Sequence, residues 1–174
     1  MRDIYTYREE KDALFANPKG SPLTQDQLAG FAGLDYFRPA PQYIVRAAVT
    51  VFEAQKIVTL ETSKGGTKHF IRHGWAKLEL SGKRECLTLY LPADDPQSPK
   101  FFVPFLDSTN GQQSYHHGRY LDLVKDDDGL ITLDFNFAYN PYCAYNSRWD
   151  CVMAPIENTI EQPVRAGERA FPEP

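Results

Sequence analysis

The hydrophobic period of the chain changes from helical to strand-like at Tyr43, and this change limits the fold more than any other feature. From Tyr43 to Phe52 successive side chains alternate between two faces, as in a half-buried β-strand. Further strand patterns, separated by turn residues, follow at residues 56–62, 68–72, 75–80, 87–91, 101–105, 119–124 and 130–137. About eight short strands predict an antiparallel meander over residues 43–137, arranged as a barrel or roll or as a sandwich.

Helical periodicity precedes this region, within residues 1–34. Apolar residues between Ile4 and Phe15 fall roughly on one face of a helical wheel, with charged residues between them. Thr24, followed three residues later by Gln27, forms a capping-box pattern for a second helix. The predicted class is therefore mainly β, or α+β by content, with two short N-terminal helices packed outside the barrel or over one end.

Length and charge limit the organisation and the partners of the chain. A length of 174 residues fits a single domain over residues 1–174, in which residues 138–174 form an irregular loop and a C-terminal cover. The net charge of −4 and the lack of a basic block argue against a nucleic-acid partner. No apolar run is long enough to cross a membrane, and the charged N-terminus is unlike a secretory signal. We therefore expect a cytoplasmic protein with neither a membrane nor a nucleic-acid partner.

The Asp-Gly pair at residues 128–129 predicts a hairpin that joins the strands at 119–124 and 130–137. Two polar clusters flank this hairpin, within residues 107–120 and 134–158. Arg119 requires a carboxylate partner if it is buried, and Asp107 and Asp134 are the nearest candidates. Because the hairpin pairs the two strands, we expect the clusters to meet and to wall a pocket. The predicted pocket residues combine a guanidinium, carboxylates, amides and aromatic rings: Asp107, Tyr115, Arg119, Asp134, Asn136, Asn140, Tyr145, Glu157 and Asn158.

Several stretches of the chain carry a resemblance to a known family. They read "PFLDSTNGQQSYHHGRYLDL", "LDFNFAYNPYCAYNSRWDC", "APIEN" and "VRAGERAF", and the earlier "LAGFAGLDYFRPAPQY" also fits. Over about residues 23–171 the chain resembles the domain of unknown function 1684 family of bacterial and archaeal proteins. The resemblance implies no activity, since the family is uncharacterised.

The resemblance assigns motif positions to both polar clusters and to the C-terminal segment. They are Asp107, Gly111, Tyr115, Gly118, Arg119, Tyr120, Asp134, Phe135, Asn136, Ala138, Tyr139, Asn140, Pro141, Cys143, Ala144, Tyr145, Cys151, Pro155, Glu157, Asn158, Ala166, Gly167 and Glu168. The chain departs from the family pattern at His116 and His117, where small residues are expected, and at "CVMAP", where a Cys-Pro-Leu-Pro-Pro run is expected. A mechanism that depends on the two histidines would therefore be peculiar to this chain.

The predicted pocket favours the binding of a small anionic or amphipathic ligand. Arg119 offers a fork for carboxylate or phosphate, the amides fix orientation, and the rings add apolar area. A structural role is the alternative: Arg119 would then only pair with a carboxylate, and residues 138–145 would close the barrel as a rigid plug. The pattern names no cofactor, no particular ligand and no oligomeric state.

The cysteines support further alternatives. Cys143 is the candidate nucleophile of a thiol-dependent enzyme, with a nearby histidine as the base. Cys143 and Cys151 with His116 or His117 have the ligand types of a zinc site, although the seven residues between the cysteines exceed the usual spacing. A regulatory disulfide between Cys143 and Cys151 and simple packing of both thiols in a structural loop are the remaining alternatives.

Overall fold

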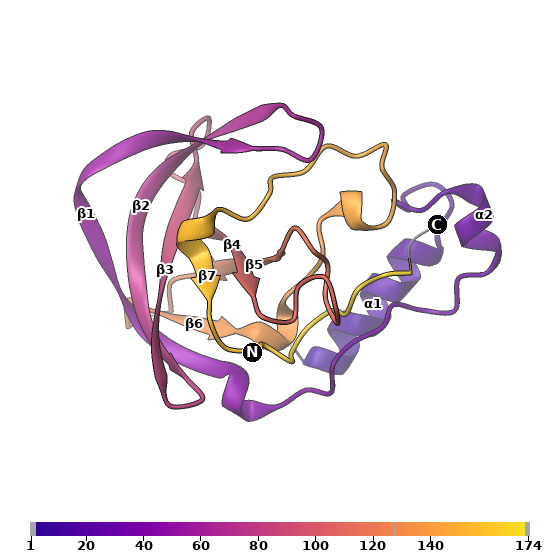
Figure 1. The fold of residues 1–174 in the computed structure, drawn as a ribbon, viewed down its shortest axis with the longest axis horizontal. Coiled ribbons are helices and arrows are strands. Elements are labelled where there is room, and N and C mark those ends of the chain that lie inside the picture. Colours follow the sequence, from indigo (N-terminus) through magenta and orange to yellow (C-terminus); the bar gives the residue numbers. More distant parts are fainter. Residues whose placement is uncertain (1–2, 127, 173–174) are drawn as a thin grey trace.

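The computed structural model describes residues 3–126 and 128–172, and its strands form one sheet that curls into a barrel (Figure 1). The strands are β1 (Ile44–Glu61), β2 (Thr67–Leu80), β3 (Lys83–Pro92), β4 (Lys100–Asp107), β5 (Arg119–Val124), β6 (Leu130–Asp134) and β7 (Thr159–Ile160). Neighbours in the order β5-β4-β3-β2-β1-β6 are antiparallel, while β7 runs parallel to β4. A backbone bridge between Lys125 and Ile131 joins β5 to β6, so that the barrel is nearly closed. The predicted mainly-β antiparallel class is confirmed.

The long pair β1–β2 replaces four of the predicted strands, because each strand continues through an irregularity instead of ending there. The register shifts between Val51 and Lys56 in β1, and next to Gly74 in β2. A Cβ on Gly74 would lie 2.5 Å from the backbone oxygen of Thr50, so the two strands approach too closely for any side chain. Such bulges bend a strand, which lets these long strands follow the curve of the barrel.

The strand predicted over residues 130–137 is shorter in the structure. β6 ends at Asp134, whose carboxylate accepts a hydrogen bond from the backbone N of Asn136 at 3.0 Å and begins a 3₁₀ turn, η2 (Phe135–Phe137). The prediction that the strand continues to residue 137 is therefore wrong, because the aspartate side chain takes over a backbone partner. Asn136 is buried and bonds both backbone groups of Ala40, which anchors the chain before β1.

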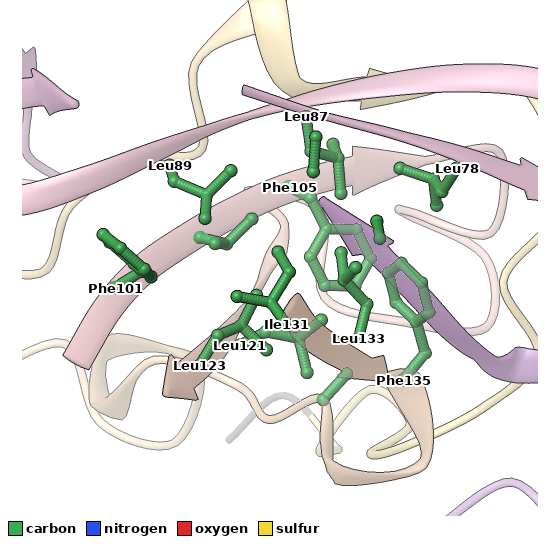
Figure 2. Close-up of a cluster of buried hydrophobic side chains, with 14 of the residues drawn as sticks. Leu78, Leu87, Leu89, Phe101, Phe105, Leu121, Leu123, Ile131, Leu133 and Phe135 are labelled. Atoms are coloured by element: carbon green, nitrogen blue, oxygen red, sulfur yellow. The ribbon is translucent and has the colours of Figure 1, made fainter. Parts of the chain in front are cut away.

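The main core fills the inside of the barrel. Alternate residues of the strands point into it, as the pleat of a sheet requires. Figure 2 shows this cluster, whose labelled members are Leu78, Leu87, Leu89, Phe101, Phe105, Leu121, Leu123, Ile131, Leu133 and Phe135. The intervening residues of the same strands, among them Phe102, Tyr120 and Asp122, consequently lie on the outer face of the sheet.

Two helices lie beside the barrel, as predicted: α1 (Ile4–Ala16) and α2 (Gln25–Ala29) (Figure 1). The capping box of Thr24 and Gln27 is present at the start of α2. Phe15 of α1 is buried against Tyr145, with ring centroids 4.8 Å apart. Neither of these helices, the two that the described residues contain, is long and apolar enough to cross a membrane.

The chain between β6 and β7 crosses from the helices back over the barrel (Figure 1). It contains the 3₁₀ turns η3 (Tyr142–Ala144) and η4 (Ile156–Asn158), and a further turn, η1 (Pro41–Tyr43), precedes β1. Residues 138–152, named here the roof loop, therefore connect the helices with the barrel.

Candidate functional site

Arg119, the first residue of β5, is completely buried. Its Nη2 donates to the Asp107 carboxylate at 2.9 Å and to the backbone oxygen of Val164 at 2.8 Å. Its Nη1 donates to the backbone oxygens of Ala166 and Glu168. Burial lowers the pKa of the guanidinium, and the charge of Asp107 opposes that shift. Arg119 thereby fixes the C-terminal segment against the end of the barrel.

Among residues 3–126 and 128–172, Arg119 and Asp134 have separate partners. Of the two candidate carboxylates, Asp107 pairs with Arg119, whereas Asp134 caps η2 through Asn136. Four protein acceptors occupy the Nη groups of Arg119, and neither Arg119 nor Asp134 lines the large cleft of the molecule. A buried charge needs such partners, and here the fold supplies them from its own backbone.

Asn158 joins two strands that hardly pair with each other. β3 and β4 share a backbone pairing only at Tyr90 and Phe102. The side chain of Asn158 accepts from Thr88 N at 2.8 Å and donates to Thr88 O and to Pro104 O, each at 2.9 Å. The predicted ligand-binding amide thus replaces missing contacts between these strands, and it is fully buried.

Glu157, next to it, lies on the outer face of the sheet. Its carboxylate pairs with Arg72 at 2.6 Å and accepts a hydrogen bond from the Tyr90 hydroxyl. Burial raises the pKa of Glu157, but the hydrogen bonds from Arg72 and Tyr90 outweigh it and hold the pKa below its ordinary value. This predicted site residue also has protein partners.

Glu168, which was not among the predicted pocket residues, connects three parts of the chain. Only 1% of it is exposed, and it accepts from Tyr145 Oη at 2.5 Å and from Asn140 N at 2.7 Å. Lys11 of α1 forms an ion pair with its other oxygen. Glu168 therefore ties the roof loop to α1, and Tyr145 serves this contact rather than a pocket.

A large cleft lies between α1, the roof loop and the outer face of the sheet, with a volume of about 910 Å³. Aromatic rings form much of its wall. Phe70 stacks on Phe102 with centroids 5.3 Å apart, and Tyr120 meets Phe102 edge-on at 4.7 Å. The lining residues are Tyr7, Glu10, Lys11, Leu14, Phe15, Lys68, Phe70, Pro92, Ser98, Lys100, Phe101, Phe102, Tyr120, Asp122, Tyr139, Asn140, Pro141, Tyr142, Cys151 and Val152. A volume of this size is typical of small-molecule sites.

Charged groups border the aromatic wall. Lys11 lies 4.9 Å from the ring centroid of Tyr139 while it pairs with Glu168. Within residues 3–126 and 128–172, neither Lys68 nor Lys100 forms an ion pair. Asp122 adds a carboxylate that accepts from Tyr139 Oη at 3.1 Å; burial raises its pKa, which the hydrogen bond opposes.

Of the predicted pocket residues, only Asn140 lines this cleft. The sequence prediction missed the outward-facing strand residues, although the alternation of Tyr120 and Asp122 with Leu121 was visible in β5. Tyr120 and Tyr139 also belong to the family motif, and this was a second feature of the sequence that could have identified them as cleft residues. Phe70 and Lys68 come from β2 and carry no such signal, because their place in the cleft depends on how the barrel curves.

Cys143 and Cys151 are neighbours within the roof loop, and Cys151 lines the cleft. The backbone N of Cys143 donates to Cys151 Sγ at 3.3 Å, and Tyr115 Oη lies 3.5 Å from Cys143 Sγ. The hydrogen bond from the Cys151 thiol, assisted by Tyr115 and Ser63, lowers the pKa of Cys143 to about 6, although burial opposes this shift. The same interaction raises the pKa of Cys151, and burial adds to this increase. The first proton of the pair is therefore lost at a lower pH than that of an isolated thiol, and the second at a higher pH.

The histidines do not complete a catalytic or metal site with these thiols. The ring of His116 contacts His117 and Tyr115 at a tilt, His117 meets Tyr115 edge-on, and burial lowers the pKa of His117. In the part of the chain that the structure describes, Cys143 has no hydrogen bond to a histidine or carboxylate. Nor do three His, Cys, Asp or Glu side chains gather there where they could hold a metal ion, so the predicted zinc alternative lacks a ligand set.

Comparison with known proteins identifies a family and a similar solved structure. The pattern of the family described as "Protein of unknown function (DUF1684)" matches residues 29–169. The solution NMR structure of an uncharacterized protein of Haloarcula marismortui is 42% identical in sequence, with a TM-score of 0.74. That similarity covers 95% of this chain and 91% of the other. No curated protein matches the chain.

Proposed function

Because the chain belongs to the DUF1684 family of proteins of unknown function, whose description assigns no activity, we propose a function from the cleft itself. The protein binds a small amphipathic anion, an aromatic carboxylate, between α1, the roof loop and the outer face of the sheet. The observation that carries this proposal is the stacked pair of Phe70 and Phe102 in a cleft that also presents the ammonium groups of Lys68 and Lys100.

The aromatic wall suits the apolar part of such a ligand. A ring inserted beside Phe102 would meet ring faces and edges, the geometries in which aromatic groups attract one another. The ammonium groups suit the anionic part, since a carboxylate near Lys68 or Lys100 would gain an ion pair that the protein does not already provide. Lys11 is less available, because Glu168 neutralises it.

Calorimetric titration with three probes tests both halves of the proposal. The probes are 1-naphthoate, its neutral analogue 1-naphthamide, and acetate. We expect naphthoate to bind, naphthamide to bind about tenfold or more weakly, and acetate not to bind measurably; a tenfold difference in affinity corresponds to about 1.4 kcal/mol. If naphthamide binds as well as naphthoate, the cleft is an apolar groove without anion preference and the proposal fails.

Variants locate the binding. Lys100→Gln and Lys68→Gln should each weaken naphthoate binding by about fivefold to tenfold, while Phe102→Leu should weaken both aromatic probes. Lys56→Gln is the matched control, because Lys56 is an exposed lysine of β1 outside the cleft. An equal effect of Lys56→Gln would mean that overall charge, rather than the cleft, determines binding.

We also propose that the protein works in the cytoplasm on a small molecule rather than on nucleic acid. Its three cysteines are free thiols, which suit a reducing compartment. Its net charge of −4 would repel a phosphate backbone.

A further inference from the structure

The thiols of Cys143 and Cys151 form a pair that the proposed ligand binding does not use. They are held together by local structure: η3 places the backbone N of Cys143 3.3 Å from Cys151 Sγ. The backbone of Cys151 is fixed in turn by Ser63, which donates its N–H to Cys151 O at 2.8 Å and accepts from Cys151 N at 3.2 Å. The two thiols also share a hydrogen bond, so they are neighbours in the fold without a bond between their sulfurs, and such neighbours are arranged to form a disulfide.

The surroundings of Cys143 favour reaction at its sulfur. Tyr115 Oη lies 3.5 Å away, and hydrogen bonds from Tyr115, Ser63 and the Cys151 thiol hold the pKa of Cys143 low. The thiolate is the form of cysteine that attacks disulfides. Both cysteines are partly exposed, so a small reagent can reach them.

We propose that Cys143 and Cys151 are a redox-active dithiol that a small-molecule disulfide converts into an intramolecular disulfide. The Cys143 thiolate attacks one sulfur of the reagent, whose S–S bond breaks and releases one thiolate. That thiolate takes the proton of Cys151, and the Cys151 sulfur then attacks Cys143 and expels the second half of the reagent as a thiolate. The protein loses two electrons to the reagent, which leaves as one thiol and one thiolate.

The disulfide would act on the roof of the cleft. It would close the short loop 143–151, which lies between the cleft residues Tyr142 and Val152. Oxidation therefore fixes the spacing of two walls of the cleft, whatever the cleft binds.

Cys86 offers an internal control within the same chain. It is exposed on β3, and burial of its sulfur raises its pKa. It borders the small hollow around Arg72 and Trp75, not the large cleft. Cys86 should therefore be accessible to a disulfide reagent but react slowly. Among the described residues it has no neighbouring thiol with which it could form an intramolecular disulfide.

The test is to incubate the reduced native protein with oxidised and reduced glutathione at graded ratios and then to alkylate the remaining thiols. Mass spectrometry of the intact protein and of its peptides identifies the products. We expect wild-type protein to lose two of its three alkylatable thiols, with a 143–151 crosslinked peptide and no retained glutathione. Cys151→Ser should trap glutathione on Cys143, Cys143→Ser should slow adduct formation on Cys151, and Cys86→Ser should behave as wild type.

Two results would overturn the proposal. One is that wild-type protein keeps three alkylatable thiols at the most oxidising ratio; the other is that it keeps glutathione on Cys143 without forming the crosslink. An equal rate of adduct formation at Cys151 in Cys143→Ser would contradict the proposed order of attack. Serine is close to cysteine in size, and the amide NMR spectrum of each variant checks that it is folded.

Discussion

The guanidinium of Arg119 meets the carboxylate of Asp107 at 2.9 Å, and neither side chain has any surface exposed to solvent. Removing either partner leaves the other as an uncompensated buried charge. We expect Arg119→Ala and Asp107→Ala each to lower the free energy of unfolding by about 3 to 5 kcal/mol. Urea denaturation followed by tryptophan fluorescence measures this loss.

An exposed pair provides the control for that prediction. Arg46 and Asp128 lie 2.6 Å apart, but about half of each side chain is exposed. Arg46→Ala should therefore lower the free energy of unfolding far less than Arg119→Ala does. Similar losses of unfolding free energy for Arg46→Ala and Arg119→Ala would show that burial does not determine how much the Arg119 pair contributes to stability.

Asn158 should stabilise the contact between β3 and β4 as much as a backbone pairing between these strands would. Asn158→Ala removes three hydrogen bonds and leaves the backbone groups of Thr88 and Pro104 O without them, which should cost about 2 to 4 kcal/mol. Hydrogen exchange at the Thr88 amide should accelerate more than elsewhere in β3. The exposed neighbour Thr159 is the control, since Thr159→Ala loses one exposed hydrogen bond to Ile156 O. Unchanged protection of Thr88 would refute the role given to Asn158.

Gly167 should not tolerate alanine, for reasons of both conformation and space. Its φ is +74°, and a Cβ there would lie 2.4 Å from Ala138 O. Gly82 has a φ of +76° with nothing near a Cβ, so it isolates the conformational part. We expect Gly82→Ala to cost about 1 to 2 kcal/mol and Gly167→Ala clearly more, measured by thermal unfolding. Equal costs would mean that the contact with Ala138 relaxes without strain.

The fold class was readable from the sequence because the alternation that begins at Tyr43 is a local signal. So was the capping box of Thr24 and Gln27, whose partners are three residues apart. The end of β6 was not readable, since the Asp134 side chain competes with the strand ladder only once the chain bends there. A local pattern thus predicts elements better than it predicts where a polar side chain ends them.

The candidate site was harder to predict than the fold. Arg119 was identified as needing a carboxylate, and Asp107 was one of the two candidates, but three of its partners are backbone oxygens of the C-terminal segment. Backbone partners leave no residue-specific mark in a sequence. The cleft was missed because Lys68 of β2 and Lys100 of β4 line the same cleft only as a result of the curvature of the barrel.

Alkylation of Cys143 should depend on pH in a way that Cys86 does not. The pKa of Cys143 is lowered from 9.0 to about 6, so the reactive thiolate is lost only as the pH falls through about 6. The iodoacetamide rate at Cys143 should therefore rise from pH 5 to 7 and then level off, while burial raises the pKa of Cys86 and delays its rise to alkaline pH. Cys151→Ala removes the main donor and should shift the Cys143 profile upward. Parallel profiles for Cys143 and Cys86 would contradict the proposed thiol pair.

The central claim is that the cleft between α1, the roof loop and the outer face of the sheet binds an aromatic anion. The most direct measurement is an NMR titration of the isotope-labelled native protein with 1-naphthoate. Saturable shifts should concentrate at residues around Phe70, Phe102, Tyr120 and Tyr139, together with the side-chain signals of Lys68 and Lys100. Saturable shifts centred elsewhere, or none at millimolar naphthoate, would contradict the account.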